Sequence, residues 1–386
     1  MALRVGFNAI PLLSPLTGIG NYIVYLGAAL AASGDVDAYS FYGYRWRHEP
    51  PCVTASGPRG RNSQRMRDLV KPLVPFKREL RRAQQQPFFA RGLRRHAIAL
   101  YHEPNYIPIR YDVPVVTTIH DLSWLRYPET HPTDRVRWLE RAMPRALADS
   151  AAVLVDSEFV RQEVLTTFGI DPARVHTAHL GVSPVFRPRS DAQTRVTLNA
   201  LGLAHGEYVL AVGTIEPRKN IRHVLEAYAR LPDAMRKRHP LVIAGAKGWR
   251  AADLRSALRV LFERGLIRFL GHVPDGDLPI LYAGAAAFVF ASIYEGFGLP
   301  PLEAMASGVP VLVAERASLP EVTGDAALMI DPTRPDDTAV KLASLLDDKA
   351  IRDDFARRGL GRAAGFTWDA CAQATLRVYR SVIGAA

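Results

Sequence analysis

The sequence predicts an α/β protein made of two doubly wound domains. The chain has 386 residues, which is more than one hydrophobic core usually organises. Short apolar runs rich in β-branched and aromatic residues alternate with helical patterns, which is typical of βα units around a parallel sheet. The alternation stops at a turn-rich segment, residues 183–206, and then starts again. We therefore expect two domains of similar architecture.

The first domain, residues 1–185, contains six expected strands. They are Leu3–Ile10, Tyr39–Tyr44, Ile98–His102, Val113–His120, Ala152–Asp156 and Val175–Leu180. Helical spacing appears over Tyr22–Ala32 and Arg135–Ala148, and Ser157 stands where an N-cap would begin a helix that runs to Phe168. This order predicts a sheet with helices on both faces.

The second domain, residues 186–370, repeats the pattern, and a C-terminal helix at about 370–386 is expected to pack back on the first domain. Its expected strands are Tyr208–Gly213, Leu241–Gly245, Ile267–Gly271, Ala287–Ser292, Val309–Ala314 and Ala327–Ile330. Ligands of such sheets bind beyond the carboxyl ends of the strands. A cleft between the two domains is therefore the expected site.

The composition is that of an ordinary globular chain, with 48% hydrophobic and 23% charged residues, and this excludes wholesale disorder. The formal net charge is +11, and its origin is local. Residues 45–95 contain 14 Lys or Arg against three acids, whereas the remainder has 35 of each. A basic stretch of this kind suits an anionic membrane surface or a nucleic acid, and a solvated charged face is the alternative interpretation.

Residues 5–34 carry no charge, but Pro11, Pro15, Gly18 and Gly20 interrupt this run. The pattern favours a buried strand, a turn and a helix over a signal peptide or a membrane span, so we expect a cytoplasmic protein. The two cysteines lie far apart in the sequence without metal-ligating neighbours, which gives no sign of a disulfide framework or a zinc site.

A Gly-rich loop is expected at residues 16–21, between the first strand and the first helix. Glycines let the backbone approach a ligand, and free amides at a helix start favour an anion. Alone, Gly18 and Gly20 fit a plain turn equally well. The third glycine of a dinucleotide fingerprint is missing, which counts against a nicotinamide enzyme.

Two adjacent cations, Arg218 and Lys219, follow the first strand of the second domain. Arg offers a planar fork and Lys a mobile point charge, so the pair would clamp a diphosphate and stabilise a departing phosphate. A solvated basic turn is the alternative interpretation of this motif when it is taken alone.

Two glutamates, Glu295 and Glu303, are separated by seven residues after the strand Ala287–Ser292. Gly296 and Gly298 place Glu295 on a loop, while Pro301 suits a first helical turn and places Glu303 near a helix start. Such a pair can hold different parts of one ligand.

These motifs together resemble the retaining glycosyltransferases of family 4, which have the GT-B fold of two Rossmann-like domains facing each other across a cleft. The resemblance is carried by Glu295 and Glu303, Glu216–Asn220, Gly271–Pro274, Ser318–Val322, Gly324–Ala327, Phe366–Trp368, Gly18–Tyr22, His102–Asn105 and Thr118–Leu122. The last three motifs are similar to the branch that includes bacterial O-antigen mannosyltransferases. Residues 45–96 are the least family-like part.

The resemblance implies roles for residues of both domains. Arg218 and Lys219 would neutralise the diphosphate leaving group, so that no metal is required. Glu303 would accept hydrogen bonds from the ribose hydroxyls and Glu295 from the donor sugar. The donor would also contact the backbone amides of Phe297, Gly298 and Leu299, and the glycines Gly18 and Gly20 of the first domain.

In the first domain, His120 ends an expected strand and would reach the cleft as a donor-sugar contact or a support for the transition state, with general-base catalysis as a weaker suggestion. His102 and Asp121 are candidates for the acceptor side, although a buried polar role fits His102 equally well.

The implied activity is transfer of a hexose, for which mannose from GDP-mannose is preferred, to a lipid-linked or oligosaccharide acceptor in surface polysaccharide synthesis. A UDP-sugar or another GDP-sugar is the alternative donor. The acceptor would be linked to a polyprenyl diphosphate, and residues 45–96 would dock the first domain on the cytoplasmic membrane leaflet. A basic nucleic-acid-binding protein is the alternative of another class; it explains the charge but not the glutamate motif, so no nucleic-acid partner is expected.

Overall fold

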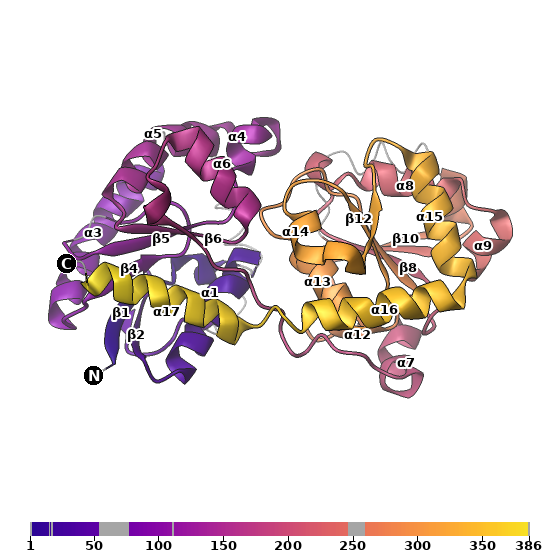
Figure 1. The fold of residues 1–386 in the computed structure, drawn as a ribbon, viewed down its shortest axis with the longest axis horizontal. Helices are drawn as coiled ribbons and strands as arrows, with labels where there is room; N and C mark the ends of the chain where they lie inside the picture. Colours follow the sequence, from indigo (N-terminus) through magenta and orange to yellow (C-terminus); the bar gives the residue numbers. More distant parts are fainter. Residues whose placement is uncertain are drawn as a thin grey trace, which may run out of the picture.

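The computed structural model has two lobes that lie side by side (Figure 1). It describes residues 2–14, 16, 18–53, 77–109, 112–245 and 259–384. Each lobe is built around one sheet with helices on both faces, which confirms the predicted fold class of two doubly wound α/β domains.

The N-terminal lobe contains a seven-stranded sheet in the order β3-β2-β1-β4-β5-β6-β7. The strands are β1 (Leu3–Asn8), β2 (Val36–Phe41), β3 (Trp46–Arg47), β4 (Leu100–Glu103), β5 (Val115–Ile119), β6 (Ala152–Val155) and β7 (Val175–Thr177). All pairs are parallel except β2 with β3. The six expected strands are confirmed, although the second starts three residues earlier than predicted, and the short antiparallel β3 was not foreseen.

Helices cover both faces of this sheet. They are α1 (Gly18–Ala32), α3 (Lys77–Arg95), α4 (Ser123–Arg126), α5 (Thr133–Asp149) and α6 (Glu158–Phe168), with short 3-10 helices at Ile10–Leu13, Pro128–Thr130 and Pro172–Arg174. The predicted N-cap is confirmed, because Ser157 Oγ accepts a hydrogen bond from the amide of Val160 at 3.2 Å. The predicted loop at residues 16–21 is wrong from Gly18 onward, where the first turn of α1 begins.

The C-terminal lobe has a six-stranded parallel sheet in the order β10-β9-β8-β11-β12-β13. The strands are β8 (Val209–Val212), β9 (Leu241–Ala244), β10 (Ile267–Gly271), β11 (Ala287–Phe290), β12 (Val311–Ala314) and β13 (Leu328–Ile330). The helices are α7 (Asp191–Ala200), α8 (Ile221–Ala229), α9 (Asp233–Arg238), α11 (Arg259–Glu263), α12 (Leu278–Ala283), α13 (Leu299–Ala306), α14 (Leu319–Thr323), α15 (Pro335–Asp347) and α16 (Lys349–Ala363), with 3-10 turns at Pro217–Lys219 and Gly324–Ala326.

The chain crosses between the lobes twice, at adjacent places. The first crossing follows β7, and the second precedes the last helix, α17 (Trp368–Gly384), which lies against α1 of the N-terminal lobe. The amide of Val182 donates to the carbonyl of Phe366 at 3.0 Å, and a Cβ at Gly181 would lie 2.2 Å from the Trp368 nitrogen. The two crossings therefore form one narrow connection.

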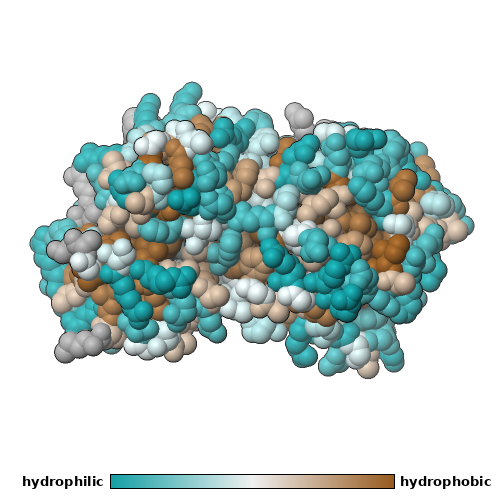
Figure 2. Space-filling model, viewed as in Figure 1, coloured by the Kyte–Doolittle hydropathy of each residue, from teal (hydrophilic) through white to brown (hydrophobic). Residues whose placement is uncertain are grey.

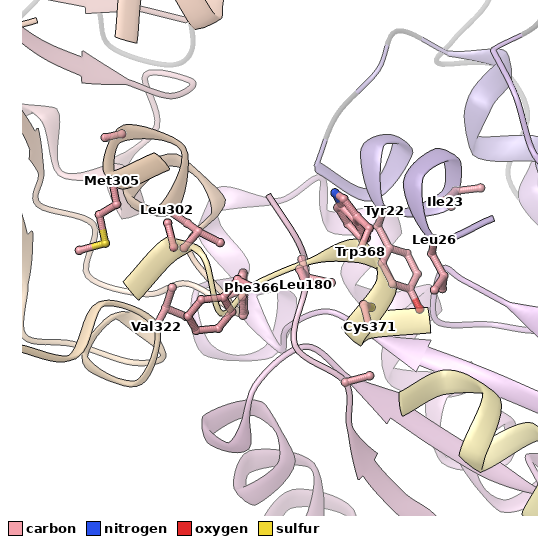
Figure 3. Close-up of a cluster of buried hydrophobic side chains, with 14 of the residues drawn as sticks. Tyr22, Ile23, Leu26, Leu180, Leu302, Met305, Val322, Phe366, Trp368 and Cys371 are labelled. Carbon is pink, nitrogen blue, oxygen red and sulfur yellow. The ribbon is translucent and has the colours of Figure 1, made fainter. Parts of the chain in front are cut away.

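One hydrophobic cluster runs through this connection. In Figure 3, Phe366 lies beside Leu302 and Val322 of the C-terminal lobe, while Trp368 lies beside Tyr22 of α1. The ring of Trp368 also stacks on Tyr25 with centroids 5.4 Å apart. The returning helix is thus held to the first lobe by buried aromatic side chains.

The face drawn in Figure 2 is mostly hydrophilic over both lobes, with smaller apolar patches visible on each lobe. Across the residues that the structure describes, we find no helix whose length and apolar character would let it cross a membrane.

Candidate active site

The loop between β11 and α13 holds Glu295 at the side of the C-terminal lobe that faces the N-terminal lobe. Ser318 Oγ, at the start of α14, donates to the carbonyls of Glu295 and Phe297 at 2.9 and 2.8 Å. Ser292 Oγ donates to Glu295 Oε1 at 2.6 Å. The loop is therefore fixed on both sides of Glu295, a residue that is only 8% exposed.

Arg218 and Lys219 lie beside Glu295, as the resemblance implies for residues of one site. Both belong to the 3-10 turn after β8, the strand that pairs with β11. Lys219 Nζ is 2.5 Å from Glu295 Oε1, and Arg218 Nη1 is 3.3 Å from Glu295 Oε2 and 2.7 Å from the Tyr294 carbonyl. Glu216 accepts from Arg218 Nη2 at 2.7 Å. The strand pairing thus brings the two motifs together.

The charges of this cluster are mutually stabilised. Burial alone would raise the pKa of the Glu295 carboxyl, but Lys219 and Arg218 hold it below its ordinary value. Burial alone would lower the pKa of Arg218, but Glu295 and Asp121 raise it above its ordinary value. Arg218 Nε is buried without a hydrogen-bond partner among the described residues. The site therefore holds two fixed cations, and the Lys219 ammonium directs one of its three N–H donors at Glu295.

Glu303 is the fifth residue of α13, whereas Glu295 lies on the loop before this helix. This position confirms the prediction of one glutamate on a loop and the other near a helix start. Burial raises the pKa of Glu303 to about 7.

Among the first three residues of α13, Leu299 carries a backbone N–H, whereas Pro300 and Pro301 carry none. Gly298 has a left-handed φ of 114°, and a Cβ there would lie 2.8 Å from the side chain of Leu319, so the position requires glycine. The amide of Leu299, the first residue of the helix, has no acceptor within the helix, and the helix dipole favours an anion there. Phe297 is buried and Leu299 half-buried. These are the three residues whose amides are predicted to contact the donor.

The ring of His120 points into the N-terminal lobe, contrary to the expectation that it would project into the cleft. Its Nδ1 is 2.7 Å from Asp156 Oδ2, and its Nε2 is 2.8 Å from the Pro104 carbonyl. Because a carbonyl only accepts, Nε2 must carry a proton, and burial is outweighed by Asp156, which raises the pKa of His120. Neither ring nitrogen is free for a sugar hydroxyl or for general-base catalysis in this state.

The backbone of His120 nevertheless borders the site. A Cβ at Gly296, next to Glu295, would lie 1.8 Å from the carbonyl oxygen of His120. The two lobes are therefore in direct backbone contact beside the Glu295 carboxylate, and only glycine fits at residue 296.

Asp121 lies across the interface from Arg218. Burial would raise the pKa of Asp121, yet the Arg218 guanidinium and the hydrogen bonds from Ser123 hold it below its ordinary value. Tyr106 also donates to Asp121 Oδ1 at 3.0 Å. Asp121 thus adds a third carboxylate to the surroundings of the two cations.

His102 does not line the acceptor side, so the alternative of a buried polar role is correct. It is fully buried between Tyr379 Oη, 2.6 Å from Nδ1, and Thr118 Oγ1, 2.8 Å from Nε2. Burial lowers the pKa of His102 to about 3. This neutral histidine connects α17 to the sheet of the N-terminal lobe.

Gly18 and Gly20 lie in the first turn of α1. Gly18 is exposed, with open space where a Cβ would stand, whereas a Cβ at Gly20 would lie 2.7 Å from the side chain of Leu16. Close packing therefore explains Gly20, and the donor contact of both glycines stays a prediction.

Several residues of the site were not foreseen: Glu216, Ser292, Ser318, Tyr294 and Asp156. Glu216 is adjacent in sequence to the cations, and that proximity was the available signal. Ser292 lies three residues before Glu295 and Ser318 begins a motif of the resemblance, so their positions in the sequence were also available signals. Tyr294 and Asp156 act through contacts between distant segments, for which the sequence offers no pattern.

Comparison with known proteins agrees with this geometry. The model described as "Glycosyl transferases group 1" matches residues 200–362, and the model "Glycosyltransferase Family 4" matches residues 16–186. The O-antigen chain mannosyltransferase B of Escherichia coli is 38% identical over 98% of this chain and 100% of its own. The chain belongs to glycosyltransferase family 4. It is therefore a glycosyltransferase, as the sequence predicts.

Solved structures show that this glycosyltransferase has the GT-B fold. Sucrose-phosphate synthase from Thermosynechococcus elongatus superposes with a TM-score of 0.73 at 22% identity, covering all of both chains. Anabaena HepE, solved in complex with UDP and glucose, superposes with a TM-score of 0.70 at 17% identity over 98% of this chain and 100% of that one.

Proposed function

We propose that this glycosyltransferase is a retaining mannosyltransferase that uses GDP-mannose and extends a lipid-linked saccharide of an O-antigen. The observation that carries the proposal is the cluster of Lys219 and Arg218 on Glu295, held where the two lobes meet. The likeness to the Escherichia coli O-antigen chain mannosyltransferase B supports mannose as the transferred sugar.

The cluster suits a donor with a diphosphate leaving group. Breaking the bond between the anomeric carbon and the phosphate oxygen leaves negative charge on the diphosphate, and Lys219 and Arg218 would stabilise that charge. The amides of Phe297, Gly298 and Leu299 would add hydrogen bonds to the phosphate. Because these groups are fixed before the reaction, they require little rearrangement in the transition state.

Front-face substitution accounts for retention of configuration. The acceptor oxygen would bond to the anomeric carbon on the face from which the phosphate departs, and the acceptor proton would pass to that phosphate oxygen. This route needs no carboxylate nucleophile, unlike the two-carboxylate hydrolases. It also needs no free imidazole, which fits the engaged ring of His120.

The nucleotide and the sugar are tested together. A thermal-shift screen of the wild type against GDP, UDP, ADP and TDP should show the largest stabilisation by GDP, because a ligand of the folded state raises its apparent stability. Transfer of radiolabelled mannose from GDP-mannose to an added lipid-linked saccharide should follow.

Glu303→Ala should reduce the increase in melting temperature that GDP causes, since it removes the proposed partner of the ribose hydroxyls. Glu263→Ala, which changes an exposed glutamate, is the control and should leave that increase unchanged. A larger shift by UDP than by GDP, with transfer from a UDP-sugar, would reject the GDP-mannose assignment.

We also propose that the outer face of α3 docks the enzyme on an anionic bilayer. The buried side of α3 packs through Phe89 and Leu93 on the sheet. The outer face consists of Leu80, Arg81, Gln84, Phe88, Arg91 and Arg95, all exposed. Tyr44 is also exposed and packs on Phe88 with ring centroids 5.5 Å apart.

The combination of exposed apolar and cationic side chains is typical of helices that lie at a membrane surface. Each cation would contribute about 1 kcal/mol. Arg82 is not part of this face, because it is half-buried and donates to the carbonyls of Ile107 and Pro108. Residues 54–76 of the basic segment lie outside the described residues.

Cosedimentation with phosphatidylglycerol vesicles tests the membrane proposal. Changing Arg81, Arg91 and Arg95 to Glu should abolish binding at low salt. The same charge change in the C-terminal lobe, at the exposed Lys237, Arg259 and Arg357, should leave most binding intact. Equal loss in both triple variants would mean that net charge alone drives the association.

A further inference from the structure

The loop that carries Glu295 is held by the N-terminal lobe on both sides of the carboxylate. Before it, the hydroxyl of Tyr294 accepts from the amide of Leu122 at 2.9 Å and donates to Glu163 Oε2 at 2.5 Å. After it, the carbonyl of Gly296 accepts from Ser157 Oγ at 2.6 Å. The neighbours of Glu295 are thus bonded to the other lobe.

Tyr294 inserts deeply into that lobe. It is 4% exposed, and its ring packs against Tyr127 and Phe159 with centroids 5.5 and 5.9 Å away. Glu163, its acceptor, is itself oriented by Arg126, whose Nε lies 2.8 Å from Glu163 Oε1. The Tyr294 hydroxyl is therefore bound by two groups of the N-terminal lobe, the Glu163 carboxylate as acceptor and the Leu122 amide as donor.

A second contact reinforces the first at the start of α6. Both oxygens of Glu321, on α14, accept backbone amides of this helix, from Glu158 at 2.8 Å and from Phe159 at 3.0 Å. His179 Nε2 lies 2.7 Å from Glu321 Oε1. A carboxylate is stabilised at a helix N-terminus. Helix α6 and its N-cap residue Ser157 therefore form hydrogen bonds with the C-terminal lobe at three places: at Ser157, at the first amides of the helix and at Glu163.

We propose that Tyr294 is a positioning residue that makes the placement of Glu295 depend on closure of the two lobes. The inference rests on the proposed function, because it assigns Glu295 and the adjacent cations to sugar transfer. When the lobes separate, Tyr294 loses both hydroxyl partners and Gly296 loses Ser157, so the loop is fixed from the C-terminal lobe alone. When they close, the Leu122–Tyr294–Glu163 contact fixes Glu295 against its two cations.

Tyr294→Phe tests this inference, because it keeps the ring contacts and removes only the hydroxyl. It should lower kcat for mannose transfer about tenfold, in line with the loss of a hydrogen bond to a charged group. The Kd for GDP should change less than twofold, since the nucleotide is bound by the C-terminal lobe. Small-angle scattering of the GDP-bound protein should give a larger radius of gyration than for the wild type.

Variants of Glu163, which accepts the hydrogen bond from the Tyr294 hydroxyl, test whether this contact causes the effect. Glu163→Ala should match Tyr294→Phe, and the double variant should be no slower than the slower single one. Glu163→Gln keeps an acceptor oxygen and should retain most of the activity. Tyr228→Phe, which loses hydroxyl bonds to the Arg236 and His239 carbonyls within the C-terminal lobe, is the matched control and should keep the wild-type kcat.

Unchanged kcat in Tyr294→Phe, or additive losses in the double variant, would overturn the inference. A wild type that neither binds GDP nor transfers mannose would instead reject the proposed donor. In that case, the scattering comparison is repeated with the nucleotide that the thermal-shift screen selects, and an unchanged radius in Tyr294→Phe then overturns the inference on its own.

Discussion

Lys219→Ala is expected to lower kcat for sugar transfer by about 10²–10³-fold, the usual effect of removing one preorganised charge-stabilising donor. The ammonium lies 2.5 Å from Glu295 and 5.4 Å from the centre of the Phe290 ring, which fixes its position. Its loss leaves Arg218 alone to stabilise the departing diphosphate. Single-turnover kinetics with saturating donor would measure the effect directly.

The expected loss is specific to this lysine. Lys237→Ala, which removes an exposed lysine on α9, should leave kcat unchanged. GDP binding by Lys219→Ala should weaken much less than kcat falls, because leaving-group charge develops mainly in the transition state. A fall in GDP affinity as large as the fall in kcat would assign Lys219 to ground-state binding instead.

Gly296→Ala is expected to lower kcat/KM by at least about 10²-fold, the scale of a misplacement of about 1 Å in a catalytic site. The added methyl would lie 1.8 Å from the His120 carbonyl oxygen, and both groups belong to backbone segments. The lobes must therefore move apart beside Glu295. Steady-state kinetics would show the loss, and the melting temperature would show whether each lobe still folds.

Gly276→Ala is the matched control for this substitution. Gly276 lies in the C-terminal lobe, and a Cβ there would have no heavy atom within 4 Å. Its activity should equal that of the wild type. Full activity of Gly296→Ala would mean that transfer occurs with the lobes farther apart than in this structure.

The elements of both sheets could be predicted because buried parallel strands are continuous apolar runs, and all twelve expected strands are present. The strand β3 was not predicted, because a strand of two residues shows no alternation of apolar and polar side chains. The helical start at Gly18 escaped because glycine is a poor helix former, and close packing of Gly20 on Leu16 accounts for glycine there.

The proximity of Lys219 to Glu295 was predictable, since their motifs follow strands of one sheet and carboxyl ends of parallel strands share an edge. The inward orientation of the His120 ring was not predictable. It depends on Asp156, 36 residues away, and on the carbonyl of Pro104, which no sequence pattern marks as a partner. Contacts between the lobes, such as Tyr294 with Glu163, escaped for the same reason.

The return of α17 to the N-terminal lobe sets an order of assembly during synthesis. A ribosome releases residues 368–384 only after the whole C-terminal lobe, yet Trp368 and Tyr379 belong to the core of the first lobe. Until they emerge, His102 lacks its Tyr379 partner and the apolar side of α1 lacks its cover. The lobe that is made first therefore completes its core last, although domains generally fold from the N-terminus onward during translation.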